Sequence, residues 1–234
     1  MQVFVQGFIL CDRIKGMDKI QETAAHFLNL VNTTSYVFHL ANRNVRVVSL
    51  NFMAKDFHHM AGFQYLTDIN IPRDKKKTIT WILNEDNPIT DGYLAQSNFY
   101  KGKPNDEKDI ESRIEQLRFL EQYLDENNII RIYSPKDGPQ NNSLIECDYI
   151  IESQLPGSLT TVYIFLRHRE GIGSPCAIIS FAVKKNVTYG GQKLYWMLKD
   201  KIVNGTRKTI FQHPQYTLEQ KLENEPNAVS TLNG

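Results

Sequence analysis

Hydrophobic residues recur every three to four positions in the first half of the chain and every second position in much of the second half. A helix is predicted to begin at Asp18, because Ile20, Phe27 and other apolar residues fall on one helical face. Residues 106–127 show the helical period most clearly, and acidic side chains crowd their first turns, where the helix dipole favours them. A shorter helix is predicted within 52–66, with Gly62 marking its late turn.

The period changes to about two after residue 128, which is typical of strands. Strands are predicted there over 129–133, 144–151, 161–166 and 176–183, with a final strand over 206–211. Two earlier stretches, 35–40 and 45–50, flank a polar turn and predict a hairpin. Because the links are short, we expect antiparallel neighbours. The pattern therefore predicts an α+β fold, with N-terminal helices packed on a C-terminal antiparallel sheet of four or more strands.

The domain organisation expected from this pattern is simple. A chain of 234 residues with 41% hydrophobic residues is long enough for one well-buried core, so disorder is not expected. We predict one domain over residues 18–212, preceded by an extension over 1–17. Residues 213–234 are polar with few apolar anchors and are predicted to form a flexible tail.

Composition excludes several classes of protein. Cys11, Cys147 and Cys176 are few and widely spaced, which argues against a disulfide framework and a structural zinc site. No signal peptide and no membrane-spanning segment is recognised, so a cytoplasmic protein without membrane contact is expected. The sequence has no phosphate-binding loop, dinucleotide-binding glycine motif, serine-hydrolase elbow or zinc-protease motif, which argues against those enzyme classes.

Positive charge is concentrated late in the chain. Residues 155–213 hold 9 Lys and Arg against 2 Asp and Glu, whereas residues 100–154 hold 7 against 12. Aromatic residues are interleaved with the cations, and this mixture suits single-stranded RNA, because cations bind phosphate and rings stack on unpaired bases. Two structural alternatives stay open. The aromatic residues can belong to the core of the sheet, and the cations can pair with the acidic helix.

His58 and His59 are the first candidates for chemistry. Adjacent histidines on a helix point about 100° apart, so they converge poorly on one metal ion and at most one lies on the apolar face. A general base fits better, because imidazole titrates near neutral pH. The structural alternative is a histidine satisfied at the edge of the core or simply solvated.

Several short motifs occur in an order that resembles a known family. They are Phe57-x-His59-Met60-x-Gly62, the strand Tyr163–Leu166, Ser180-Phe181, Tyr189, and the closing Trp196-x-Leu198-Lys199-x-Lys201-Ile202. In this order they resemble the barnase–EndoU–colicin–RelE-like nuclease superfamily, in particular its phage-associated fourth branch. The resemblance covers residues 18–212. It implies a domain with helices before an antiparallel sheet, and a domain of this kind is expected to cut RNA without a metal or cofactor.

The resemblance also implies roles for particular residues. Attack of a ribose 2′-OH on the neighbouring phosphate needs a base, cations for the crowded phosphorane and an acid for the leaving oxygen. His59 would be the base or the acid, and Lys199 and Lys201 would complete the catalytic group with Tyr189. The residues expected to bind substrate are Arg167, Ser180, Lys185 and Trp196.

The function predicted from the sequence is therefore a metal-independent endoribonuclease, toxin-like or phage-encoded, acting on single-stranded or tRNA-like RNA, with a protein inhibitor or host protein as a candidate partner. One alternative is a catalytically inactive RNA- or protein-binding module of phage or mobile-element origin, with the acidic helix as its partner surface. A third hypothesis is a small-molecule or nucleotide-transferring enzyme on the same scaffold.

Overall fold

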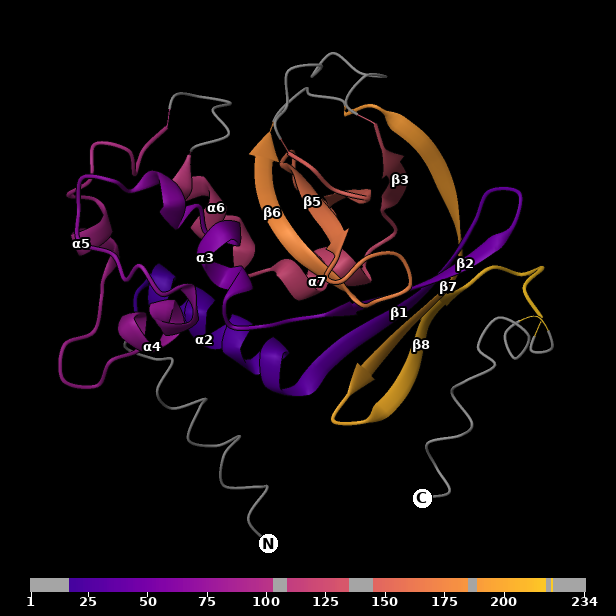
Figure 1. Ribbon diagram of the computed structural model, residues 1–234, viewed down its shortest axis with the longest axis horizontal. Coiled ribbons are helices and arrows are strands. Elements are labelled where there is room, and N and C mark those ends of the chain that lie inside the picture. The colour runs from indigo at the N-terminus through magenta and orange to yellow at the C-terminus, as the bar shows by residue number, and fades with distance from the viewer. Residues whose placement is uncertain (1–16, 103–108, 135–144, 185–188, 218–219, 221–234) are drawn as a thin grey trace, which may run out of the picture.

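The computed structural model describes residues 17–102, 109–134, 145–184, 189–217 and 220 of the chain. Helices from the first half stand together on one side of the molecule, and a strongly curved sheet stands on the other (Figure 1). The α+β class predicted from the sequence is confirmed, with an eight-stranded sheet among the described residues. Among these residues, no helix is long and apolar enough to cross a membrane.

The helical elements are mostly short. In chain order they are α2 (Lys19–Thr33), α3 (Asp56–Met60), the 3₁₀ turns η1 (Phe63–Tyr65) and η2 (Lys75–Lys77), α4 (Thr78–Ile82), α5 (Asp91–Leu94), α6 (Ile110–Leu117) and α7 (Leu120–Asp125). The predicted start of α2 is confirmed. The Asp18 carboxylate accepts the Gln21 amide at 3.3 Å, and the Gln21 side chain accepts the Asp18 amide at 3.3 Å.

Two predicted helices differ from the observed ones. The helix expected over 106–127 is divided into α6 and α7 at residues 118–119, and residues 106–108 lie outside the described part. The helix expected within 52–66 is confined to α3. Gly62 ends it in the left-handed region, with φ at 82°, and η1 follows in a new direction. This change of direction places the side chains of α3 and η1 along the same cleft.

The strands are β1 (Thr34–Ala41), β2 (Val45–Asn51), β3 (Ile129–Tyr133), β4 (Tyr149–Gln154), β5 (Thr161–His168), β6 (Cys176–Lys184), β7 (Gly191–Val203) and β8 (Thr206–Gln212). They lie in the order β1-β2-β6-β5-β4-β3-β7-β8, and β1 also pairs with β7, so the pairings close into a ring. The predicted hairpin is confirmed as β1 and β2. Neighbours are antiparallel except β2 and β6, which share the single pair Leu50 and Cys176.

The longest strand, β7, was not predicted from the sequence. It pairs with β1, β3 and β8 and therefore joins the two halves of the sheet. Its sequence lacks a clean alternation because Lys199 and Asp200, which look like surface residues, are both buried. The strand expected over 144–151 begins at Tyr149, and residue 144 lies outside the described part.

The core lies between the helices and one face of the sheet, and a second apolar cluster covers the opposite face of β3 to β6. Strand β5 shows this double burial most directly. Val162, Ile164 and Leu166 point into the main core. Tyr163 and Phe165, between them, belong to the second cluster. Arg167 and His168, the last residues of β5, reach the surface, and there they line the cleft.

Residues at the predicted domain ends are described only in part. Residues 1–16, 218–219 and 221–234 lie outside the described part. Tyr216, within the predicted tail, is buried, and its hydroxyl is 2.7 Å from Nδ1 of His39 on β1. The tail is thus attached to the sheet at this residue.

Candidate active site

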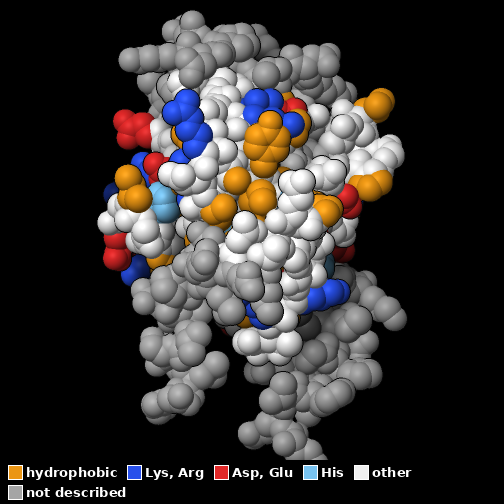
Figure 2. Space-filling model, turned by 90° about the vertical axis from the view of Figure 1, so that its right-hand side faces the viewer, with side chains coloured by type: hydrophobic (Ala, Val, Ile, Leu, Met, Phe, Trp, Pro, Cys, Tyr) orange, Lys and Arg blue, Asp and Glu red, His pale blue; other side chains and the backbone are white. Residues whose placement is uncertain are grey.

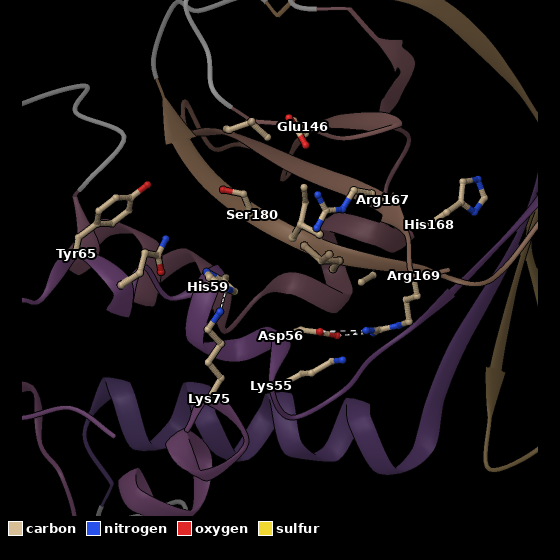
Figure 3. Close-up of a pocket in the computed structure, with 15 residues that line it drawn as sticks. Lys55, Asp56, His59, Tyr65, Lys75, Glu146, Arg167, His168, Arg169 and Ser180 are labelled. Carbon is tan, nitrogen blue, oxygen red and sulfur yellow. Dashed lines mark hydrogen bonds and ion pairs between the residues drawn. The ribbon is translucent and has the colours of Figure 1, made fainter. Parts of the chain in front are cut away.

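A cleft of about 530 Å³ lies between the helical layer and the sheet, at the end of β5 and the first half of β6 (Figure 3). One wall comes from α3 and the residue before it, with η1 and η2, and the other comes from β5, β6 and the segment before β4. The polar and charged residues that line it are Lys55, Asp56, His59, Gln64, Tyr65, Lys75, Glu146, Arg167, His168, Arg169 and Ser180. Segments more than 100 residues apart in the sequence therefore meet at one hollow.

Asp56 and Arg169 hold the two walls together. The Asp56 carboxylate accepts the backbone amide of Met53 at 2.9 Å, which fixes the first turn of α3. It also forms a bidentate ion pair with the Arg169 guanidinium, with N–O distances of 2.5 and 3.2 Å. The same guanidinium donates to the Asn51 carbonyl at 2.8 Å. Arg169 thereby connects the end of β5 to the last residue of β2 and to the start of α3, and its charge is neutralised by Asp56.

His59 projects from α3 into the cleft (Figure 3). Its Nε2 lies 2.7 Å from Nζ of Lys75, and because an ammonium can only donate, Nε2 is the acceptor. Burial lowers the pKa of His59 below its usual value, and the Lys75 ammonium acts in the same direction. The neighbouring Gln64 side chain opposes this shift. The outcome is an imidazole that stays neutral at pH 7 with a basic nitrogen facing the cleft.

Its neighbour His58 points elsewhere. It is buried, with Nδ1 3.2 Å from the Thr78 hydroxyl, and burial lowers its pKa to about 4. His168 lines the far end of the cleft, but its ring is turned away from Arg167 (Figure 3). The His168 Nδ1 lies 2.6 Å from the Ser174 carbonyl. Of the three histidines, His59 presents its ring to the middle of the cleft.

Arg167 and Ser180 face His59 from the strand wall (Figure 3). Arg167 is exposed, and within the described part of the chain no carboxylate pairs with it. Its charge acts on the His59 imidazole and contributes to the lowered pKa of that ring. Glu146 is also exposed on this wall. With Asp56 and Arg169 paired to each other, Arg167 remains available to a bound anion.

The structure brings together three of the residues predicted from the sequence. His59, Arg167 and Ser180 all line the cleft. It does not bring Lys199, Lys201, Tyr189 or Trp196 to it, and none of these four lines the cleft. Lys185 lies outside the described residues.

Lys199 and Lys201 fasten α7 to the sheet. Lys199 is 1% exposed, and its ammonium donates to the carbonyls of Leu124 and Glu126 at 3.3 and 2.7 Å. It also donates to the Asn128 side chain at 3.0 Å. Burial lowers its pKa to about 7. Lys201 pairs with carboxylates of α7, at 2.6 Å from Asp125. Both lysines are therefore engaged at the end of a helix, away from the cleft.

Tyr189 and Trp196 are core residues. Tyr189 is 2% exposed and packs in the second apolar cluster, with its ring centroid 4.7 Å from that of Tyr163. Trp196 is 8% exposed, and its indole N–H donates to the Asn128 carbonyl at 2.7 Å. Both aromatic residues therefore belong to the core of the sheet, as the structural alternative predicted. On the face of Figure 2, basic side chains stand in separate groups among apolar ones rather than in one continuous basic field.

Several cleft residues were not predicted. In the structure Lys55, Gln64, Tyr65, Lys75 and Glu146 lie in loops and 3₁₀ turns. The sequence predicted a helix within 52–66 and a strand over 144–151, and neither pattern indicated that these side chains line one cleft. The run Lys75–Lys77 was visible as a charge cluster, but nothing in the sequence connects it to His59, 16 residues earlier. Within the described residues, no three His, Cys, Asp or Glu side chains gather as they would around a metal ion.

Comparison with known proteins identifies a family model that matches most of the chain. A family model described as phage-Barnase-EndoU-ColicinE5/D-RelE like nuclease4 matches residues 19–215. This range begins at the start of α2 and extends beyond β8, so it contains both walls of the cleft. No curated protein and no solved structure matches the chain. The resemblance drawn from the order of short motifs is confirmed by this match.

Proposed function

The chain belongs to the phage-Barnase-EndoU-ColicinE5/D-RelE like nuclease4 family, and from this premise we propose that it is a metal-independent endoribonuclease. The observation that carries the proposal is that His59 and Arg167 line the same cleft from its two walls. A neutral imidazole can accept a proton there, and a guanidinium without a carboxylate partner among the described residues can bind phosphate.

The reaction we propose is attack of a ribose 2′-OH on the adjacent phosphorus. His59 removes the hydroxyl proton through Nε2 once the exposed Lys75 side chain moves from that nitrogen to the phosphate. Arg167 binds the non-bridging oxygens and stabilises the charge of the phosphorane, and Ser180 donates a hydrogen bond to it. Lys75 stabilises the leaving 5′-oxygen. The P–O5′ bond breaks as the 5′-oxygen takes a proton from the Lys75 ammonium, and the proton on His59 returns through solvent to Lys75. The products are a 2′,3′-cyclic phosphate and a free 5′-hydroxyl.

This mechanism favours RNA as the substrate. The nucleophile is the substrate's own 2′-OH, which DNA lacks. The charges that the phosphorane requires are supplied by side chains of the cleft, so the reaction is expected to proceed in a chelator. We include in the proposal the toxin-like role and the tRNA-like or single-stranded substrate expected from the sequence.

The test is cleavage of labelled single-stranded RNA by the purified chain in EDTA. We expect 2′,3′-cyclic phosphate ends and no cleavage of DNA of the same sequence. His59→Ala and Arg167→Ala are each expected to lower kcat/KM at least about 100-fold. His26→Ala is the matched control, because His26 is an exposed histidine on α2 that does not line the cleft.

Full cleavage by both cleft variants would refute the assignment of the site. A wild-type chain that binds RNA in a salt-sensitive manner without turnover would refute the enzyme and favour the inactive binding module predicted as the alternative. Cleavage that disappears in EDTA and returns with added Mg²⁺ would refute metal independence alone.

A further inference from the structure

A second hollow lies beside the cleft, on the helical layer. This groove has a volume of about 460 Å³ and runs between α2, α4 and the segment before α3. Its lining residues are Leu28, Ala54, Lys76, Ile79, Thr80, Leu83, Asn84 and Glu85. Leu28, Ala54 and Leu83 are only half-buried, so the floor of the groove presents apolar surface to solvent.

The groove and the cleft share a narrow wall. Ala54 lines the groove, whereas the next residue, Lys55, lines the cleft. On the facing turn, Lys75 lines the cleft and Lys76 lines the groove. Consecutive residues therefore line different hollows at two places, 54–55 and 75–76, so both hollows adjoin the same two stretches of backbone. An extended ligand that leaves the cleft along η2 would reach the groove at Lys76.

We propose that the groove is a subsite for a second nucleotide of the RNA strand that is cleaved beside His59. This inference rests on the proposed function, because the cleft must hold the scissile phosphate for the strand to continue in this direction. It also specifies the substrate class: the enzyme takes an extended single strand rather than a dinucleotide.

The chemistry of the groove matches the parts of a nucleotide. Its apolar floor offers a surface for the ring of an unpaired base. Lys76 lies at the side nearest the cleft, where the connecting phosphate would pass, and none of the ion pairs found among the described residues involves it. The Thr80 hydroxyl and the Asn84 amide offer hydrogen-bonding groups to the edge of a base. A duplex would not fit, because its bases are paired and stacked.

The structure also provides a matched control for charge. Lys76 and Lys77 are neighbours on η2, and both are exposed. Lys77 lines neither hollow. Removing either lysine changes the net charge equally, so a difference between the two variants reports on the groove rather than on general attraction to RNA.

The experiment measures binding of a fluorescent 2′-fluoro RNA hexamer, which cannot be cleaved by 2′-OH attack, at two salt concentrations. Lys76→Ala is expected to weaken binding about fivefold, and Lys77→Ala less than about twofold. Thr80→Trp places a large ring in the groove from an exposed position and is expected to weaken binding about tenfold. A thermal melt of each variant verifies the fold.

Cleavage supplies the second readout. In the wild type, kcat/KM for an RNA hexamer is expected to exceed that for a dinucleotide, and Lys76→Ala is expected to reduce this ratio about fivefold. Equal effects of Lys76→Ala and Lys77→Ala would overturn the subsite, as would a Thr80→Trp variant that binds the hexamer normally. An apolar peptide that binds the groove without competing with the hexamer would also overturn it.

These outcomes separate the two proposals. If the wild type cleaves RNA but the lysine variants behave alike, only the subsite fails. If nothing is cleaved but the binding differences appear, the ribonuclease proposal fails, and the groove is then a nucleotide-binding site on an inactive chain. Absence of hexamer binding by the wild type overturns both.

Discussion

At the scale of single residues, the adjacent His58 and His59 differ in burial because their rings point to different surroundings. The sequence predicts that the rings diverge and that at most one lies on the apolar face, and the structure confirms that they diverge. His58 is buried beside Thr78, whereas His59 reaches the cleft. The sequence could not show that Lys75 would approach His59, because that contact depends on the path of the loop between α3 and η2.

The lowered pKa of His59 predicts the pH dependence of cleavage. The proposed base must be neutral, so kcat/KM should be constant near neutral pH and fall as acid protonates the ring. Since burial and the Lys75 ammonium lower the pKa, the acid limb should have its inflection below 6.5. Lys75→Ala removes one of the lowering charges and should move the inflection to higher pH.

Lys55→Ala provides the comparison for this measurement. Lys55 lines the same cleft, but its charge is not among the causes of the His59 shift. Its removal should leave the inflection in place. An inflection above about 6.5 in the wild type, or a downward move in Lys75→Ala, would mean that His59 is not the titrating base.

At the scale of elements, Gly62 decides how α3 and η1 share the cleft. Its φ of 82° turns the chain after α3, so that His59 and Tyr65 line one hollow from two different elements. A Cβ at this position would lie 3.2 Å from Arg113 Cδ and 3.2 Å from Ile110 Cγ1 on α6. Backbone conformation and packing therefore both require glycine here.

Gly62→Ala should lower the free energy of unfolding by about 2–3 kcal/mol, measured by urea denaturation. Gly157→Ala isolates the backbone part of this cost. Gly157 has a φ of 74°, and a Cβ added there would meet no atom within 4 Å. Its substitution should cost about 1–2 kcal/mol. Equal losses in the two variants would show that contact with α6 contributes nothing.

The elements that the sequence predicts well are those whose own residues carry a period. The hairpin β1–β2, the start of α2 and strand β3 need no information from distant parts of the chain. Strand β7 could not be predicted in this way, because the partners that allow Lys199 to be buried come from residues 124–128. The α6–α7 helix likewise looks continuous in sequence but is interrupted at residues 118–119.

At the scale of the whole molecule, Lys199 and Lys201 connect the sheet to α7 and do not line the cleft. Lys199 donates to carbonyl groups at the end of α7, and its ammonium lies 4.1 Å from the centroid of the Trp196 ring. The segment lies within the residues that the family model matches, and its charge suggested phosphate binding. Only the tertiary structure shows that helix carbonyls use that charge.

Lys199→Met should therefore act on stability. Loss of the ammonium leaves the Leu124 and Glu126 carbonyls without their donor, at a cost of about 3 kcal/mol in urea denaturation. Lys193→Met, an exposed lysine on the same strand, should change stability by less than about 0.5 kcal/mol. A Lys199→Met chain with native stability and no cleavage would instead support the catalytic role predicted from the sequence.

The single residue pair between β2 and β6 has a mechanical consequence for the cleft. The wall that bears His59 continues from β2, and the wall that bears Ser180 belongs to β6. Backbone pairing joins them at this one point, whereas β6 is paired with β5 along a full ladder. The relative position of the two walls therefore depends on side chains, namely the apolar residues that both walls contribute to the main core and the Arg169–Asp56 ion pair, so substitutions in these side chains should alter the width of the cleft without unpairing a strand.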